Sequence, residues 1–563
     1  MVAQAAELIV HSGVVPAVGL DAGLDAAAST GRPTAVAVRD GRIIAVGGQE
    51  LLEMADAATA LIDARGGAIL PGINDGHLHF AASAITRHDH LPLRDAVSWE
   101  DIAARLDRAV PDDSGWIRAA GWDQAVLGIE GSERILPAGG STPVVAFDAS
   151  GHQLLVNTAA LDTLGLHDAA PVPGGVISRA ADGSLTGLFV DAAMRLVNDV
   201  LPPFSQAQLR RAFAAHQQEL HALGITSLTE PGLGPGGRTL IGAVCDESAL
   251  RMLEEMSATG ELTLRINVLL LFSGTGNESA YAVARGLESG LGQLDSSIDP
   301  LCLRIAGVKV FADGIPRSGT AWFHDEYELP CGHGHGALVL QGADDAAKVE
   351  QFRGIIALID QAGLQAGVHV TGDAATEALI EAVEALPRAD GAADNRHYII
   401  HGAFSDPDLL HRLVAAGIGY STNPAIRAEA GILMRRLLGA ERFAAQQPLA
   451  SAAALGVDAS LASDAPVTDP DWRHSIIAAV TRDTSAGPGD GDAQRLTLAQ
   501  ALAMMTCTPA RQDHAESEKG LLAPGYLADL CILQDPLDAN VHRLMSNPTA
   551  YTIVNGDVVY THP

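Results

Sequence analysis

Several short apolar runs, rich in β-branched residues, recur along the chain and are bounded by glycine or proline. Continuous runs of this length are typical of strands that are buried on both faces, as in parallel sheets. The most distinct runs cover residues 68–70, 307–311, 367–370, 398–401 and 459–464. The run at 367–370 is about one strand–helix unit from the run at 398–401, which is about two such units from the run at 459–464. This spacing predicts parallel strands joined by helices.

The two ends of the chain carry hairpin signals instead. Residues 34–48 form alternating or β-branched runs around Asp40-Gly41, and residues 552–560 form such runs around Asn555-Gly556. Both dipeptides favour tight hairpin turns. A further strand is predicted over 528–533, and an amphipathic helix over 205–223 that ends at Gly224.

Polar residues of metal-binding types stand at the ends of the buried strands. His77 and His79 are two residues apart, so on a strand their rings would share one face. Further along the chain such positions hold Lys309, His369, His401 and Asp464. Burying these groups is costly unless they are paired or bound to a metal. The pattern predicts one convergent site at an end of a parallel barrel, on strands 1, 4, 5, 6 and 8 of eight.

Six stretches carry a resemblance to a known family. They read PGINDGHLHF (71–80), GVKVFADG (307–314), GLQAGVHVTGDAA (363–375), RHYIIHG (396–402), ASLASDAPV (459–467) and GLLAPGYLADLCIL (520–533). In this order they resemble the metal-dependent amidohydrolase superfamily, and within it the amidohydrolase 3 branch of N-substituted formamide deformylase and YtcJ-like proteins. The resemblance covers nearly the whole chain.

The resemblance implies an α/β fold, a TIM (β/α)8 barrel with an additional small β-sandwich. The barrel would span 72–515, and residues 1–71 and 516–563 would form the sandwich together. The stretch from His79 to Lys309 is far longer than three strand–helix units need. A large insertion is therefore expected after strand 1, at about 85–215.

The family pattern also implies a metal centre. It makes His77, His79, His369, His401 and Asp464 ligands of one or two Zn²⁺ ions, or of another divalent metal. Asp464 would also be the catalytic residue that takes the proton from the attacking water. Lys309 would be carboxylated by CO₂ and bridge two metals; the alternative is a neutral lysine, or one paired with Asp313, beside a single metal.

Other residues receive supporting roles. Asp75, Asp373 and Arg396 are candidates for orienting the ligands, or else plain surface or capping residues. Trp122, His152 and Arg317 are candidates for substrate contact, the alternatives being a core position for Trp122 and lid packing for His152. His333 and His335 form a second such pair in a glycine-rich loop, where we expect a lid element.

Three departures from the family pattern surround the expected pocket. The family often has Glu at Asp191 and Gln-Pro at Asn423-Pro424, and the loop 313–320 is of an uncommon type. These differences leave the ligand set intact and bear on the substrate.

The implied function is a metal-dependent amidohydrolase, which acts on carbon–nitrogen bonds other than peptide bonds. Metal-activated hydroxide would cleave an amide-type bond, as in an N-substituted formamide, N-acyl amine or carbamate. A deaminase, an ester or lactone hydrolase, and a non-catalytic scaffold of the same fold are the alternatives.

The composition limits the classes of molecule that the protein is expected to bind. A net charge of −32 over 563 residues argues against nucleic acid and anionic membrane surfaces. The five cysteines are scattered and odd in number, which is typical of reduced thiols. No signal peptide or membrane-spanning run is evident. We expect a cytoplasmic protein with a small-molecule substrate, and a homodimer as a fair guess.

Overall fold

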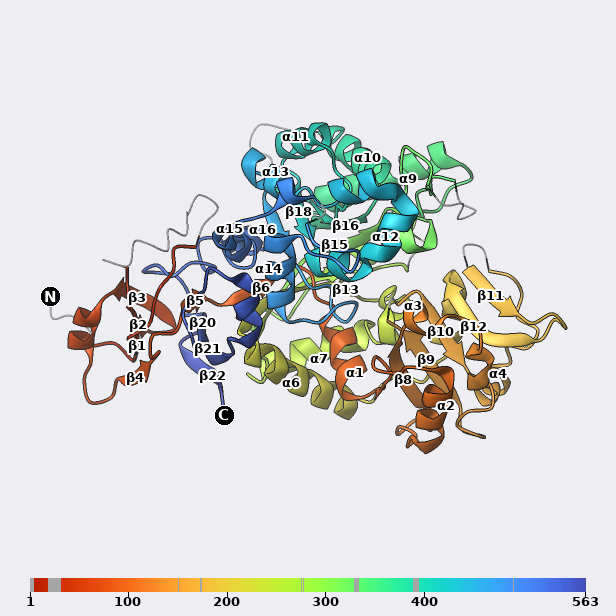
Figure 1. The fold of residues 1–563 in the computed structure, drawn as a ribbon, viewed down its shortest axis with the longest axis horizontal. Coiled ribbons are helices and arrows are strands. Elements are labelled where there is room, and N and C mark those ends of the chain that lie inside the picture. Colours follow the sequence, from red (N-terminus) through yellow and green to blue (C-terminus); the bar gives the residue numbers. More distant parts are fainter. Residues whose placement is uncertain are drawn as a thin grey trace.

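Figure 1 shows the computed structural model of the chain. The structure describes residues 5–18, 32–149, 151–172, 175–274, 276, 278–328, 334–387, 394–489 and 491–563. Among these residues, no helix is both long and apolar enough to cross a bilayer.

A parallel sheet of eight strands forms the centre of the molecule, in the order β19-β18-β17-β16-β15-β14-β13-β6. The strands are β6 (Ile73–Asp75), β13 (Ile225–Leu233), β14 (Arg265–Leu270), β15 (Leu303–Phe311), β16 (Gln365–Val370), β17 (Tyr398–His401), β18 (Gly419–Thr422) and β19 (Ala459–Leu461). The two end strands approach each other, because the Ser463 N–H donates to Asp75 and the Asp464 N–H donates to the His77 carbonyl at 2.9 Å. The sheet is thus a nearly closed barrel, as predicted.

Helices cover the outside of this barrel (Figure 1). They are α1 (Phe80–His88), α6 (Gln206–Ala222), α7 (Glu247–Ala258), α8 (Ala280–Glu288), α9 (Asp345–Gln361), α10 (Asp373–Glu384), α11 (Pro407–Ala416), α12 (Pro424–Ala445), α13 (Leu449–Leu455), α14 (Trp472–Thr481), α15 (Leu498–Ala503) and α16 (Cys507–Gln512). The helix predicted over 205–223 is confirmed as α6. Ser205 and Gln208 form a capping box at its start, and Gly224 follows its end at φ 85°.

A second sheet lies between α1 and α6 in the chain and beside the barrel in space (Figure 1). Its order is β11-β12-β10-β9-β8-β7. The strands are β7 (Leu91–Pro92), β8 (Ile117–Trp122), β9 (Val144–Asp148), β10 (Gln153–Val156), β11 (Gly175–Arg179) and β12 (Leu185–Asp191), with helices α2 (Trp99–Arg108), α3 (Gln124–Leu127), α4 (Thr158–Leu164) and α5 (Arg195–Asn198). Two apolar clusters pack on this sheet, around Phe147 and around Trp122.

Strands from both chain ends build two four-stranded sheets, β3-β2-β1-β4 and β22-β21-β20-β5. They comprise β1 (Leu8–His11), β2 (Ala35–Arg39), β3 (Arg42–Gly47), β4 (Ala60–Asp63), β5 (Ile69–Pro71), β20 (Leu530–Leu533), β21 (Thr549–Val554) and β22 (Asp557–Thr561). One apolar cluster joins the sheets and includes Val36 and Leu530. Both predicted hairpins form, with φ of 50° and 71° at Asp40-Gly41 and of 53° and 83° at Asn555-Gly556.

The described residues also form short 3-10 helices. They are η1 (Gln49–Met54), η2 (Ser132–Ile135), η3 (Ala192–Met194), η4 (Gly237–Thr239), η5 (Ile241–Ala243), η6 (Pro316–Ser318), η7 (Asp492–Gln494) and η8 (Val541–Ser546).

Candidate metal centre

The predicted ligands lie on the barrel strands expected for them, as Lys309, His369 and His401 do, or a few residues after those strands. Counted along the chain, β6, β15, β16, β17 and β19 are the first, fourth, fifth, sixth and eighth strands of the barrel. In a parallel sheet the carboxyl ends of all strands meet at one edge. The side chains that end these strands therefore converge.

The paired histidines do not lie on a strand, contrary to the sequence-based expectation. β6 ends at Asp75, and His79 is the N-cap of α1. Backbone hydrogen bonds from Leu78 to Thr229 and from His79 to Ala465, both 2.9 Å, hold the segment across the barrel mouth. The two rings therefore meet edge to face, with centroids 5.1 Å apart, instead of pointing alike from one strand face.

Asp464 lies against both of these rings. Its Oδ1 is 3.1 Å from His77 Nε2 and 3.4 Å from His79 Nε2. Burial alone would raise the pKa of Asp464, but the adjacent His77 and His79 rings hold it well below its ordinary value. Burial also lowers the pKa of His77 well below its ordinary value. An anionic carboxylate thus faces neutral imidazole, which is the protonation that metal binding requires.

His401 and His369 complete the group, with ring centroids 4.6 Å apart. One nitrogen of each already has a partner. His401 Nδ1 is 2.7 Å from Asn423 Oδ1, and His369 Nε2 is 3.1 Å from the Gly314 carbonyl. These partners leave Nε2 of His401 and Nδ1 of His369 available. Ligand atoms of His77, His401 and Asp464 all lie within 4.8 Å of one another.

Lys309 is buried in β15, with 2% of its surface exposed. Burial lowers its pKa to about 8, against the opposing charges of Asp464, Glu278 and Glu230. Among the described residues it forms no ion pair with Asp313. The Asp313 carboxylate instead accepts backbone N–H groups of Trp322, Thr371 and Gly372, each at 2.9 Å.

Sequence reasoning missed two buried carboxylates beside Lys309. Glu230 lies in β13, and its Oε1 is 3.9 Å from His79 Nδ1. Glu278 follows β14 and accepts the Phe311 N–H with both oxygens, at 2.9 and 3.0 Å. For Glu230 the sequence did contain a signal, because this glutamate stands inside an apolar run. The Pro231 that follows it makes the segment look like a surface turn when only the local sequence is considered.

Of the three residues predicted to orient ligands, only Asp75 lies in the centre. It is fully buried and accepts N–H groups of His77 (3.1 Å) and Ser463 (3.2 Å). Asp373 instead accepts the N–H groups of His324 and Ala374, so it anchors a loop at the start of α10.

Arg396 lies at the wrong end of its strand for the predicted role. It precedes β17, whereas His401 ends that strand. Its guanidinium pairs with Glu516 at 2.7 Å and donates to the Arg511 carbonyl at 2.6 Å. Arg396 therefore braces the opposite end of the barrel.

The three residues predicted to contact the substrate also differ in where they lie relative to the metal centre. Trp122 is fully buried in the core of the second sheet and donates from Nε1 to the Ala146 carbonyl at 2.9 Å, so it makes no pocket wall. His152 lies in the neighbourhood of His369, because it helps to lower the pKa of that histidine after burial, His401 and Lys309. Arg317 reaches from η6 toward the insertion, with Nη2 3.7 Å from Asp123 Oδ1.

The second histidine pair stays apart from the centre as far as it is described. His335 Nδ1 is 2.9 Å from the Phe323 carbonyl, which fixes it within its own loop. His333 falls outside the described residues, and so does the side chain of Asp191.

The donor set fits a divalent metal ion. His77 Nδ1, His79 Nδ1 and Glu230 Oε1 are buried and have no hydrogen-bond partner within the described parts of the chain. Orphaned polar atoms of this kind are costly unless a further group satisfies them. Neutral imidazoles and carboxylates in a closed space are the donors that zinc and similar ions take.

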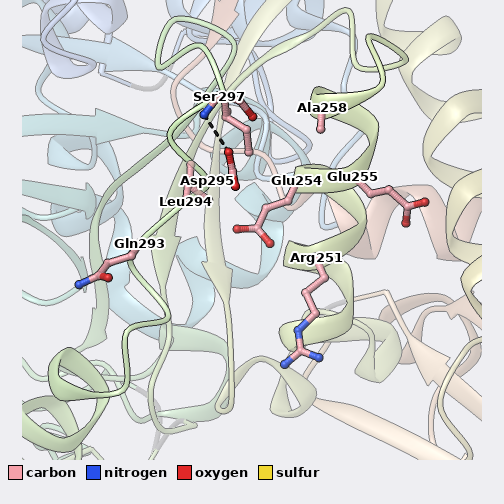
Figure 2. A pocket seen from close by; sticks show the side chains of 9 residues that line it. Arg251, Glu254, Glu255, Ala258, Gln293, Leu294, Asp295 and Ser297 are labelled. Carbon is pink, nitrogen blue, oxygen red and sulfur yellow. Dashed lines mark hydrogen bonds between the residues drawn. The ribbon is translucent and has the colours of Figure 1, made fainter.

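Two other features do not compete with this centre. The hollow in Figure 2 lies on the outer surface, between α7 and residues 293–298, and is lined by exposed charges such as Glu255. His88, His216 and Glu219 also cluster, but Arg87 already occupies both oxygens of Glu219.

The profile of the Amidohydrolase family matches residues 60–560. The chain belongs to the amidohydrolase family. Its amidohydrolase relatives include the putative amidohydrolase YtcJ of Bacillus subtilis, which is 27% identical over 94% of this chain and 96% of its own. N-substituted formamide deformylase of Arthrobacter pascens is 24% identical over 93% and 94%.

A solved structure shares the fold. An uncharacterized metal-dependent hydrolase from Pyrococcus horikoshii superimposes with a TM-score of 0.71 at 20% identity, over 94% of this chain and 97% of that one. Membership of the amidohydrolase family supports a hydrolase that depends on a divalent metal.

Proposed function

We propose that the protein is a metal-dependent hydrolase that cleaves an amide-type C–N bond. The observation that carries this proposal is that His77, His79 and His401 gather around Asp464 at one edge of the barrel, with His369 packed against His401. The expected substrates are N-substituted formamides, N-acyl amines or carbamates, and the likeness to N-substituted formamide deformylase supports this choice.

A divalent ion, for which we propose Zn²⁺, would polarise the substrate carbonyl and lower the pKa of water at the site. Asp464 is the proton acceptor for that water. Because its pKa is held low, it is anionic at neutral pH, and it can pass the proton to the departing nitrogen. We propose that His152, in the insertion, and Arg317, in η6, contact the substrate; the effect of His152 on the pKa of His369 and the approach of Arg317 to Asp123 support this role.

Lys309 is the residue for which we propose carboxylation. Its pKa of about 8 leaves a fraction of neutral amine at neutral pH. That amine can add to CO₂ and lose a proton, which yields a carbamate anion in place of a cation. The change would replace a buried positive charge beside the histidines with a further oxygen donor.

The test combines metal content with a substrate panel. Purified protein should hold one to two equivalents of zinc or a similar ion by elemental mass spectrometry, and near two after growth with bicarbonate if Lys309 is carboxylated. It should hydrolyse amides in preference to esters and aminated heterocycles. Faster hydrolysis of esters would indicate an ester or lactone hydrolase instead, and faster turnover of aminated heterocycles would indicate a deaminase.

A matched pair of variants completes the test. Asp464→Asn should lower kcat by about 10²–10⁴-fold, because the proton acceptor is lost. Asp469→Asn, at a partly exposed position in the same loop where Asp469 pairs with Arg87, should leave kcat unchanged. Protein that holds no metal, even after incubation with zinc and bicarbonate, would refute the proposal and favour a scaffold.

A further inference from the structure

His77 and His79 differ from His401 and His369 in that their Nδ1 atoms are buried and have no hydrogen-bond partner among the described residues, and of the two only His79 has a carboxylate placed near that nitrogen by an ion-pair contact. In His401 and His369 one ring nitrogen meets an amide or a backbone carbonyl at 2.7 and 3.1 Å. The Nε2 of His79 faces Asp464, and its Nδ1 has no hydrogen-bond partner in the described structure. Glu230 Oε1 lies 3.9 Å from Nδ1 of His79 and is the acceptor that an ion-pair contact places near this nitrogen.

Glu230 is held in place as a fixed carboxylate. β13 is buried along its whole length, and Glu230 is fully buried within it. Its Oε2 accepts the Ala81 N–H at 2.9 Å, in the first turn of α1. A helix N-terminus favours a negative charge, so this contact opposes the rise that burial causes in the pKa of Glu230. The second oxygen, Oε1, lacks a hydrogen-bond partner among the described residues and points to the His79 side.

We propose that Glu230 is the positioning residue of His79, fixing the proton on Nδ1 so that Nε2 is free for the metal. A ring that binds a metal through Nε2 carries its proton on Nδ1 and needs an acceptor there. The 3.9 Å between Nδ1 and Oε1 exceeds a hydrogen bond, so the bond would require a small shift of the ring on metal binding. This inference rests on the proposed metal centre.

The role also explains why a carboxylate stands in an apolar strand. Glu230 has one oxygen for the α1 N-terminus and one for His79. A glutamine has a single oxygen, and the buried Ala81 N–H would take it. The amide nitrogen would then face His79 and impose the wrong tautomer. We therefore expect Glu230→Gln to disturb the centre although its shape is nearly unchanged.

The experiment measures zinc affinity by competition with a chromogenic chelator. Wild-type protein, Glu230→Gln and the control Glu219→Gln are compared. Glu219 is matched because its carboxylate also contacts histidines, His88 and His216, but away from the centre. Thermal melting of each variant without metal verifies folding. Glu230→Gln should weaken zinc binding about 10–100-fold, and Glu219→Gln less than about twofold.

A crystal structure of the zinc-loaded wild-type protein provides the second readout. It should show His79 bound through Nε2 and Glu230 Oε1 within hydrogen-bond distance of Nδ1. An unchanged zinc affinity in Glu230→Gln, Glu230 bound directly to zinc, or His79 bound through Nδ1 would each overturn the inference while the metal centre stands. Wild-type protein that binds no zinc would overturn the proposed function together with it.

Discussion

The buried ion pair between Arg265 and Asp529 should couple the barrel to the sheet at the chain ends. Arg265 begins β14, and Asp529 directly precedes β20. Two hydrogen bonds join them, Nε to Oδ2 at 2.6 Å and Nη2 to Oδ1 at 3.0 Å, and their side chains are only 8% and 5% exposed. Asp529 also accepts the Asn555 N–H at 2.9 Å. Replacing Asp529 with leucine leaves a buried guanidinium without its counter-charge.

Breaking a buried pair from one side costs about 3–5 kcal/mol. Unfolding entropy of about 2.1 cal/mol/K per residue over 563 residues amounts to roughly 1.2 kcal/mol/K. Asp529→Leu should therefore lower Tm by about 3 °C if the whole chain unfolds as one unit. Arg265→Met combined with Asp529→Leu should recover most of this loss, because a well-packed apolar pair often matches a buried ion pair.

Differential scanning calorimetry of the two single variants and the double variant measures the coupling. Asp538→Leu is the control, since Asp538 pairs with Arg543 at 3.0 Å in the same C-terminal region but at an exposed site, where such pairs contribute little. Its Tm should stay near that of the wild type. An Asp529→Leu variant that melts with the wild type, or a double variant whose loss equals both single losses added, would refute the reasoning.

Three further outcomes are expected. Asn423→Leu removes the acceptor of His401 Nδ1, so zinc affinity by chelator competition should fall about 10–100-fold, and an equal affinity would count against this role. Removing metal with a chelator should lower Tm in calorimetry. Zinc at about 100 times its Kd should then raise the free energy of unfolding by about 2.7 kcal/mol, and a Tm that does not change with zinc would contradict this. Burial lowers the pKa of His221 to about 4 from 6.5. The unfolded chain therefore binds this proton more tightly, and acidification from about pH 6.5 to 4 should cost up to about 3 kcal/mol in urea unfolding. His221→Gln should flatten that slope, and an unchanged slope would show that other groups cause it.

The sequence by itself located several of the strands and the polar residues that lie at or just beyond their ends. Apolar runs and turn residues are local signals, since they follow from the alternation of side chains and from the φ angles that glycine and asparagine tolerate. The hairpins at Asp40-Gly41 and Asn555-Gly556 could be located for this reason. A polar residue that ends a buried strand is also visible locally, which is why His369, His401 and Asp464 were found.

Tertiary structure alone decided which side chains meet. Glu230 reaches His79 only because β13 pairs with β6 in the barrel, a contact between segments far apart in the chain. The same long-range packing places Trp122 in an apolar core and puts Arg396 at the opposite end of β17 from His401. Local patterns determine which face or end of a strand a residue occupies, whereas the neighbours across the sheet follow from strand pairing and burial, which the whole chain determines together.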